Sequence, residues 1–378
     1  MGAALSRGRG YRRRSIKQRF PEDTRYPSPV HQHWYHGGRH HYILPLDVPL
    51  PPRRNGRRLL QPRWLTLFTA IAACFAHVAS ACAPAGPPPP AADSLRVYFL
   101  NVGQGDAALI ITPDGVTALV DGGDRLRGAE LVKWLRSMGL QKLDWVMPSH
   151  PHADHIAGLN LVLAELPVAN ALLSAQTNDT QTYRRQLDLL REKGVPVTDA
   201  VEGLTIPLGG RVTATVLNPP AGLLRTSEPE EDNSVVLRVC IAVTCMLFTG
   251  DIGDGGERSM IARYGTAADR IRSHVLKVSH HGSAEPNHPD FLAMVQPDVA
   301  LIGVGLANPF RHPTQKALDR LGATGAAIYC TFVHGTLLVE LTESSYRVQQ
   351  LRDLTIRPTS GGRVVPAPPL SPEPCSAQ

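Results

Sequence analysis

The sequence predicts a layered α/β domain, and three features of its pattern carry that prediction. From Leu95 onward, short apolar runs of strand length alternate with segments of helical spacing. Turn-forming stretches such as Gly103-Gln104-Gly105 and Pro113-Asp114-Gly115 separate the early strands. Polar clusters rich in His and Asp directly follow several of the apolar runs, which places candidate ligands at adjacent strand ends.

Each expected strand is a short apolar run bounded by turn residues. These strands cover residues 95–100, 107–111, 116–120, 143–149, 212–217, 234–240, 245–248, 275–278, 299–302, 326–329 and 335–341. The expected helices carry apolar residues at helical spacing, and two of them stop before Gly139 and Gly194. They cover residues 127–138, 156–166, 182–193, 257–264, 289–295 and 314–321.

Charge is divided unevenly along the chain. The 378 residues carry a formal net charge of +6, but 14 of the 39 basic residues and only three of the 33 acidic ones precede Cys82. The remainder therefore holds 25 basic and 30 acidic residues, a net charge of −5. A broad electrostatic grip on nucleic acid needs clustered Lys and Arg, so the expected folded part does not offer one.

Composition divides the chain into five segments. Residues 1–58 are rich in Arg, His, Pro and Gly without an apolar period, which predicts a disordered basic extension. Residues 59–82 join an apolar run to Ala79-Ser80-Ala81-Cys82, the order of a signal peptide or a lipoprotein signal. A Pro-rich linker over 83–93, a folded domain over 94–356 and a disordered tail over 357–378 are expected to follow.

The signal predicts export, to the cell envelope as a lipoprotein or periplasmic protein, or to the extracellular space. Cleavage after Ala81 and lipidation of Cys82 both fit it, and a transmembrane anchor is a third option, although residues 65–81 are short for a span. Membrane contact is expected only through the signal or a lipid anchor at Cys82. The chain is expected to form no channel of its own, and the oligomeric state is left open.

The later cysteines leave their redox state open. Cys240 and Cys245 flank an expected turn between two strands, so either a disulfide or two buried thiols fit the pattern. Cys330 and Cys375 have no obvious partners in the sequence.

His150-Pro151-His152-Ala153-Asp154-His155 places four good metal ligands within six residues, between an apolar strand and a helix. The extended strand end can turn His150 and His152 toward one point, while Asp154 and His155 on the tightening turn face another. Imidazole and carboxylate together suit zinc, or manganese and iron as the carboxylate share rises. The sequence therefore predicts one or two divalent ions, with Zn²⁺ favoured and Mn²⁺ as the alternative.

Three further polar clusters follow apolar runs. Asp121 and Asp251 each stand just past an expected strand, and His280 and His281 follow Lys277-Val278-Ser279. A lone Asp in such a position is usually a turn cap. Together with the opening motif, however, these residues form a recurring pattern of ligands on neighbouring strand ends, which favours a shared site.

These motifs resemble the metallo-β-lactamase superfamily, and more closely the metallo-β-lactamase domain of the ComEC-type DNA-internalisation competence proteins. The resemblance covers about residues 95–351, with the motifs in the family's order. The motifs are 99–106, 119–123, 149–158, 232–237, 248–251, 277–283, and Asn308 with His312-Pro313. The resemblance implies a four-layer αββα sandwich with the metals at one edge.

The resemblance also implies roles for single residues. Asp251 would bridge two metals; one would be held by His150 and His152, and the other by Asp154, His155 and His280. The superfamily's additional His is missing and Asn233 takes its place, which leaves the first metal poorly held. Asp121 would orient the ligand loop, and Asp106 with Gln104 would line the pocket mouth or form a tight turn. Substrate contacts are implied for Asn233, Ser234, His281, Ser283 and Asn308, and proton transfer for Asp154 and His312, the latter otherwise a capping residue.

The resulting hypothesis is an exported metal-dependent hydrolase that uses a metal-activated water, most plausibly a phosphodiesterase or nuclease with nucleic acid as its substrate. An alternative is a small-molecule ester, lactone, thioester or β-lactam hydrolase, although the missing His argues against an efficient lactamase. A third hypothesis is a non-catalytic envelope module stabilised by metal. Structural zinc sites are usually sulfur-rich, which disfavours that reading.

Overall fold

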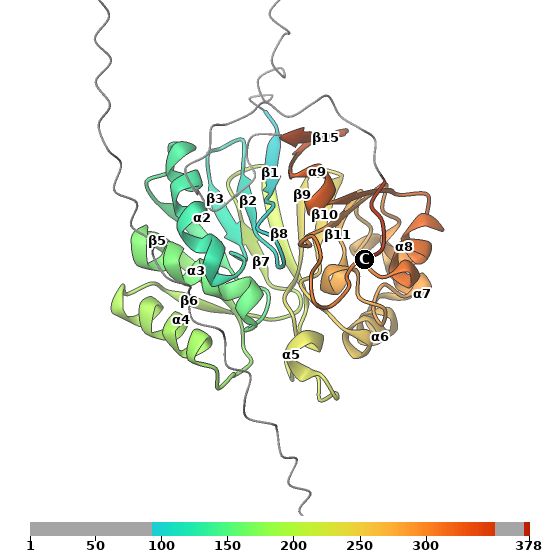
Figure 1. The fold of residues 1–378 in the computed structure, drawn as a ribbon, viewed down its shortest axis with the longest axis horizontal. Coiled ribbons are helices and arrows are strands. Elements are labelled where there is room, and N and C mark those ends of the chain that lie inside the picture. The colour runs from blue at the N-terminus through green and yellow to red at the C-terminus, as the bar shows by residue number, and fades with distance from the viewer. Residues whose placement is uncertain (1–92, 352–373) are drawn as a thin grey trace, which may run out of the picture. The chain divides into compact units, whose positions relative to one another are not determined.

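The computed structural model describes residues 93–351 and 374–378, so the predictions for the basic extension, the signal, Cys82 and most of the linker and tail lie outside the described residues. Two sheets form the centre of the fold (Figure 1). The larger sheet has eight strands in the order β15-β14-β1-β2-β3-β4-β5-β6. These are β1 (Leu95–Phe99), β2 (Ala108–Ile111), β3 (Thr117–Val120), β4 (Leu143–Met147), β5 (Val168–Ser174), β6 (Val197–Ala200), β14 (Thr336–Leu341) and β15 (Tyr346–Leu351).

The smaller sheet has seven strands in the order β13-β12-β11-β10-β9-β8-β7. These are β7 (Thr205–Pro207), β8 (Val212–Asn218), β9 (Val236–Ile241), β10 (Thr244–Phe248), β11 (Val275–Lys277), β12 (Val299–Ile302) and β13 (Ala327–Cys330). Strands β3 to β6 of the first sheet and β10 to β13 of the second run parallel. Because parallel strands end at the same edge of a sheet, the polar clusters that follow them are brought together.

The helices lie on the outer faces of the two sheets (Figure 1). Three of the longer ones begin at a side chain that accepts a backbone hydrogen bond, namely Asp124, Thr180 and Thr314. The helices are α2 (Arg125–Ser137), α3 (Ala153–Glu165), α4 (Gln181–Glu192), α5 (Pro229–Asp232), α6 (Asp254–Tyr264), α7 (Pro289–Val295), α8 (Gln315–Gly322) and α9 (Thr331–His334), with short 3₁₀ turns η1 (Ala268–Arg270) and η2 (Ser279–Gly282).

Three hydrophobic cores separate four layers. Along β1, Val97 and Phe99 face the core between the two sheets, whereas Tyr98 points into the core beneath α2, α3 and α4. This alternation is what a strand buried on both faces requires. A third core joins the smaller sheet to α6, α7 and α8 through residues such as Leu276 and Phe291. The layer order is therefore αββα, and the predicted fold class is confirmed.

The predicted strands and helices all occur, with ends that differ by a few residues. Four strands were not predicted: β5, β6, β7 and β15. The last of these, Tyr-Arg-Val-Gln-Gln-Leu, is a half-buried edge strand and therefore lacks the apolar run on which the prediction relied.

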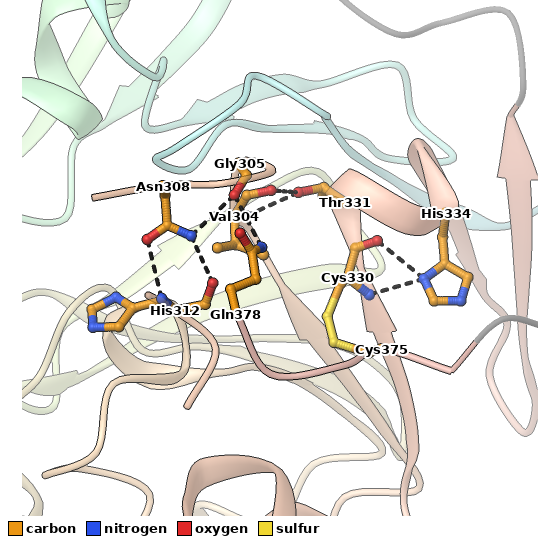
Figure 2. Close-up of a disulfide and its surroundings, with 9 residues drawn as sticks. All are labelled: Val304, Gly305, Asn308, His312, Cys330, Thr331, His334, Cys375 and Gln378. Atoms are coloured by element: carbon orange, nitrogen blue, oxygen red, sulfur yellow. Dashed lines mark hydrogen bonds between the residues drawn. A yellow bond between two sulfur atoms is a disulfide. The ribbon is translucent and has the colours of Figure 1, made fainter. Parts of the chain in front are cut away.

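Both cysteine pairs of the folded part form disulfides. Cys240 and Cys245 pair across the neighbouring strands β9 and β10, which decides between the two options left open by the sequence. Cys330, for which the sequence indicated no obvious partner, pairs with Cys375. Residues 374–378, at the end of the segment predicted to be a disordered tail, contact the folded domain. Gln378 Nε2 donates to the carbonyl oxygen of Gly305 at 3.1 Å, and Figure 2 shows this segment beside the loop after β12.

Among the residues that the structure describes, no helix is both long and apolar enough to cross a membrane.

Candidate metal centre

Side chains from distant parts of the chain converge on the carboxylate of Asp251, just past β10. Its Oδ2 lies 3.2 Å from His155 Nε2 and 3.1 Å from His281 Nε2. The Nε2 atoms of His150 and His280 are each 4.0 Å from the same oxygen. The polar clusters that the sequence placed at separate strand ends thus meet at one point, where loops of both sheets come together.

Three of these imidazoles are anchored through their outer ring nitrogen. His150 Nδ1 is 3.0 Å from Ser149 Oγ, His155 Nδ1 is 3.0 Å from Asp121 Oδ2, and His281 Nδ1 donates to the Gly303 carbonyl oxygen at 2.7 Å. This arrangement fixes the orientation of each ring and leaves Nε2 facing the centre, as in metal-binding histidines.

A separate observation supports metal binding by these histidines and Asp251. Within the described part of the chain, the inner Nε2 atom of His150 is buried yet has no hydrogen-bond partner, and that of His281 has only carboxylate oxygens beside it, of Asp251 at 3.1 Å and of Asp154 at 3.4 Å. Buried polar atoms are nearly always paired, so an unpaired Nε2 that faces this carboxylate calls for a ligand. Two neutral imidazole nitrogens and a carboxylate are a donor set that divalent zinc or manganese accepts.

The neighbouring histidines His280 and His281 differ in burial and in their distance from Asp251. His281 is buried and anchored, whereas the His280 side chain is 31% exposed and its outer nitrogen has no hydrogen-bond partner among the described residues. Both residues have positive φ, 47° and 52°, and this turn of the backbone sends the second ring inward. Of the two rings, His281 brings its Nε2 nearer to Asp251 Oδ2, at 3.1 Å against 4.0 Å for His280, and the roles predicted for both residues stay predictions.

His152, predicted to share a metal with His150, lies at the rim. Its Nε2 is 2.8 Å from Glu230 Oε2, and Glu230 Oε1 in turn accepts from Asn178 Nδ2 at 2.8 Å. Its Nδ1 is 3.7 Å from a carboxylate oxygen of Glu231. An acidic segment of α5, which the sequence analysis did not single out, thus borders the side of the centre where the superfamily's additional His is missing.

Asp121 holds the ligand loop at its base. It accepts hydrogen bonds from the backbone nitrogen of Ser149 at 2.7 Å and from Ser149 Oγ at 2.9 Å, besides facing His155. Ser149 bonds in turn to His150, so one buried carboxylate orients two imidazoles. These bonds match the orienting role expected of Asp121.

Two buried charges stand behind Asp251. Lys277, at the end of β11, lies 2.5 Å from Asp106 Oδ2 and 3.2 Å from Asp251 Oδ1, and donates to the Gly250 carbonyl oxygen at 2.6 Å. Asp106, His155, Asp251 and His281 form a buried group whose potential ligand atoms lie within 4.8 Å of one another. Asp106 therefore lies inside the centre, where the sequence had left a pocket mouth and a tight turn as alternatives, and Lys277, part of a quoted motif, had been given no role in the site.

The charged groups of the centre strongly shift one another's pKa values. Burial alone would raise the pKa of Asp251, but the cationic forms of His281 and His155 and the ammonium of Lys277 hold it well below its ordinary value. Burial lowers the pKa of His281, while Asp251 and Asp106 raise it, to about 10. The centre thus favours an ionised carboxylate next to positive charge, which is the environment a bound cation would also provide.

Asp154, the predicted proton carrier, lies at the open side of the centre. Its Oδ2 is 3.4 Å from His281 Nε2 and 3.8 Å from His155 Nε2, and its side chain is 31% exposed. Gly105 allows this approach, because its φ is +112° and a Cβ there would lie 2.1 Å from the Asp154 carbonyl oxygen.

Most of the predicted substrate contacts have structural partners instead. The amide of Asn233 bonds to backbone atoms of Leu224 and Pro229, and Ser234 Oγ accepts from the Asp251 backbone nitrogen at 3.3 Å. Both residues hold loops, because their polar atoms already have these partners. Asn233 also lines the neighbouring cavity, and its predicted substrate contact stays a prediction.

Asn308 is likewise engaged within its own loop (Figure 2). Its amide donates to the carbonyl oxygens of Gly305 and His312 and accepts from the His312 backbone nitrogen. The His312 ring lies 5.7 Å from that of His280, and burial together with the charge of His281 lowers its pKa to about 4. His312 is therefore near the centre, while Asn308 shapes the loop. The Ser283 side chain is buried, and its predicted role stays a prediction.

A cavity of about 370 Å³ adjoins the rim of the centre. Its lining includes Glu230, the partner of His152, together with Gln176, Leu223 and Arg225. Such a volume is enough for part of a small organic or nucleotide ligand next to the metal ligands.

Comparison with known proteins places this geometry in a family. The metallo-β-lactamase superfamily profile matches residues 100–305. ComE operon protein 3 of Bacillus subtilis is 25% identical over 261 residues, 64% of this chain and 32% of that protein. Competence protein ComA of Neisseria gonorrhoeae and Recombination protein 2 of Haemophilus influenzae are each 28% identical, over 68% of this chain and 34% and 30% of their own lengths. The chain thus spans about a third of these relatives.

Solved structures resemble the fold at lower identity. CmlA, a diiron β-hydroxylase from Streptomyces venezuelae, is 16% identical with a TM-score of 0.43, over 70% of this chain and 55% of that one. The metallo-β-lactamase fold protein YhfI from Bacillus subtilis is 13% identical with a TM-score of 0.41, over 62% and 95%. The resemblance to the ComEC-type competence proteins is confirmed by the curated relatives. By its matching profile and its αββα layers, this chain belongs to the metallo-β-lactamase superfamily, a family generally of metal-dependent hydrolases.

Proposed function

We propose that this protein is an exported metal-dependent phosphodiesterase or nuclease of the ComEC-like subgroup. The observation that carries the proposal is the set of buried imidazoles whose outer nitrogens are anchored and whose Nε2 atoms face Asp251. A structural role alone would not leave the Nε2 atom of His150 buried without a hydrogen-bond partner.

The residues divide the chemical work. His155, His281 and Asp251 would hold the first cation, and His150 Nε2 faces the same carboxylate oxygen and would join them or hold a second. A bound divalent cation supplies water of pKa about 7, so that hydroxide is available near neutral pH without a strong base. Asp154, at the open side, is placed to take or return a proton at its Oδ2. His312, whose lowered pKa keeps it neutral near pH 7, could accept one.

The proposed substrate class rests on the relatives and on the neighbouring cavity. The curated relatives are named for competence and recombination, which are processes of DNA. Arg225 lines the cavity beside Glu230 and offers a positive charge for a phosphate near the metal ligands. The acidic rim residues Glu230 and Glu231 favour the binding of a second cation. That cation would in turn attract a polyanionic substrate.

Export is supported by the cysteines of the folded part. All four of them form disulfides, Cys240 with Cys245 and Cys330 with Cys375. Structural disulfides persist in oxidising compartments such as the periplasm or the extracellular space, and are rare in the reducing cytosol. This agrees with the signal expected at residues 59–82, and whether Cys82 carries a lipid remains part of the proposal.

The test is nucleic-acid hydrolysis by purified protein. Single-stranded DNA is incubated with Mn²⁺ or Zn²⁺ and wild type, with Asp251→Ala, and with Asp269→Ala, an exposed aspartate outside the centre, as the matched control. Wild type and Asp269→Ala should release nucleotides, and Asp251→Ala should not. Equal release from all three would defeat the proposal, and metal-dependent turnover of an ester or of nitrocefin without any DNA cleavage would replace the substrate class.

A further inference from the structure

A fixed cation is already built into the centre. The side chain of Lys277 is 2% exposed, and burying an ammonium is costly unless it is well paired. It has three oxygen partners: Asp106 Oδ2, Asp251 Oδ1 and the Gly250 carbonyl oxygen, at 2.5, 3.2 and 2.6 Å. Three oxygens, two of them from carboxylates, form the kind of cage in which proteins hold a hard metal ion.

The carboxylate of Asp251 therefore serves two sides. Its Oδ1 faces Lys277, and its Oδ2 faces the Nε2 atoms of His155 and His281. We call the Oδ2 side the outer cation position, defined by Asp251 Oδ2 and those two Nε2 atoms. The inner cation position is defined by Asp251 Oδ1, Asp106 Oδ2 and the Gly250 carbonyl oxygen.

Asp106 belongs to the inner position and not to the outer one. It approaches the two histidines from behind, 3.8 Å from His155 Nδ1 and 3.8 Å from His281 Nδ1. Those Nδ1 atoms are the anchored ones, bonded to Asp121 and to Gly303. Asp106 is close to the ligands without sharing their open side, and its carboxylate is matched by Lys277.

From this geometry we infer that Lys277 permanently fills the inner cation position in place of a metal ion. Its contact with Oδ1 holds Asp251 so that only Oδ2 faces the outer position. Lys277 is thus a positioning residue: it touches no substrate, and it sets both the orientation of the bridging carboxylate and the number of ions that the centre accepts. The inference rests on the proposed metal centre and adds to it an ion position that the wild-type chain keeps closed.

The test counts ions. Lys277→Ala vacates a position lined by three oxygens, so Mn²⁺ should enter it. Equilibrium dialysis against Mn²⁺ followed by elemental analysis should find one more ion per chain in Lys277→Ala than in wild type. Lys277→Arg, which keeps a cation in place, and Lys142→Ala, which removes an exposed lysine paired with Asp144, should both bind the wild-type number. Adding Asp106→Asn to Lys277→Ala should abolish the extra ion.

Thermal unfolding gives the second readout. Without metal, Lys277→Ala should melt below wild type, because two buried carboxylates lose their cation, and Mn²⁺ should raise its melting temperature more than that of wild type. If the variant is recovered folded only in Mn²⁺, the inference stands. An unchanged ion count, or a variant that stays unfolded in saturating Mn²⁺, would overturn it. Absence of ions from wild type would count against the proposed function, while an ion bound by Lys277→Ala alone would still support the inner position.

Discussion

Glu257 holds the segment that carries His281, and replacing it by glutamine isolates the effect of its charge. Its carboxylate, on α6, is fully buried. It accepts hydrogen bonds from Ser279 Oγ at 3.1 Å and from the backbone nitrogens of Asn287 and His288 at 2.8 Å each. The segment from Ser279 to His288, which includes both histidines after β11, therefore closes on this one side chain.

The size and sign of the effect follow from its pKa. Burial raises the pKa of Glu257 from its ordinary 4.5 to about 7, against the hydrogen bonds from His288, Asn287 and Ser279 that lower it. A shift of this size corresponds to about 3 kcal/mol, at about 1.4 kcal/mol per unit. Because the folded-state pKa is the higher one, the stabilisation is complete below pH 4.5 and is lost as the pH rises to 7. Wild type should thus lose about 3 kcal/mol relative to Glu257→Gln across that interval, and nothing further above it.

Urea unfolding of both proteins at half-unit steps from pH 4.5 to 8.5 measures this difference, with chelator present so that metal binding does not contribute. Glu285→Gln, an exposed glutamate on the same segment, should show no such trend. A pH-independent difference between wild type and Glu257→Gln would refute the reasoning. If wild type instead gained stability over the variant as the pH rose, the three donors would outweigh burial.

Three further outcomes are expected. Asp121→Asn, which loses the acceptor that orients His155 and Ser149, should weaken Zn²⁺ binding about 10- to 100-fold in a competition titration with a chromogenic chelator, and unchanged affinity would mean the orientation is set elsewhere. Chelation should lower the melting temperature, since an ion at 100 times its Kd stabilises the fold by about 2.7 kcal/mol; a melting curve indifferent to chelator would speak against a bound ion. Removing the Cys330–Cys375 disulfide should cost about 4 kcal/mol and removing Cys240–Cys245 about 2 kcal/mol in urea unfolding, because the loops they close span 45 and 5 residues; equal losses would contradict the loop-length argument.

The sequence predicted the fold well because its information was local. Apolar runs, glycine stops and strand-end ligands each occupy a few consecutive residues, and the four layers follow from the family that those motifs resemble. Strand β15 escaped prediction because an edge strand needs little burial, so half of its residues are polar.

The details of the site depended on geometry that residue order does not carry. His280 and His281 are the same residue type, so the sequence does not tell which ring is buried; that depends on the course of the left-handed turn that contains both residues. Lys277 completes an otherwise apolar strand, Val-Leu-Lys, which was the one available signal that a buried charge lies there. The partner of Cys375 lies 45 residues away, at a distance where spacing says nothing about pairing.

The origin of the ligands has a consequence for how this molecule can be divided. Asp121, His150 and His155 follow strands of the larger sheet, whereas Asp251 and His281 follow strands of the smaller one. An ion held by both sets spans the seam between the two halves, so neither half could retain it after cleavage between β6 and β7. Two separately expressed halves would still share the pairing of β1 with β14 and the core between the sheets, so they could reassociate without zinc or manganese, but only the reassociated pair would complete the ligand set.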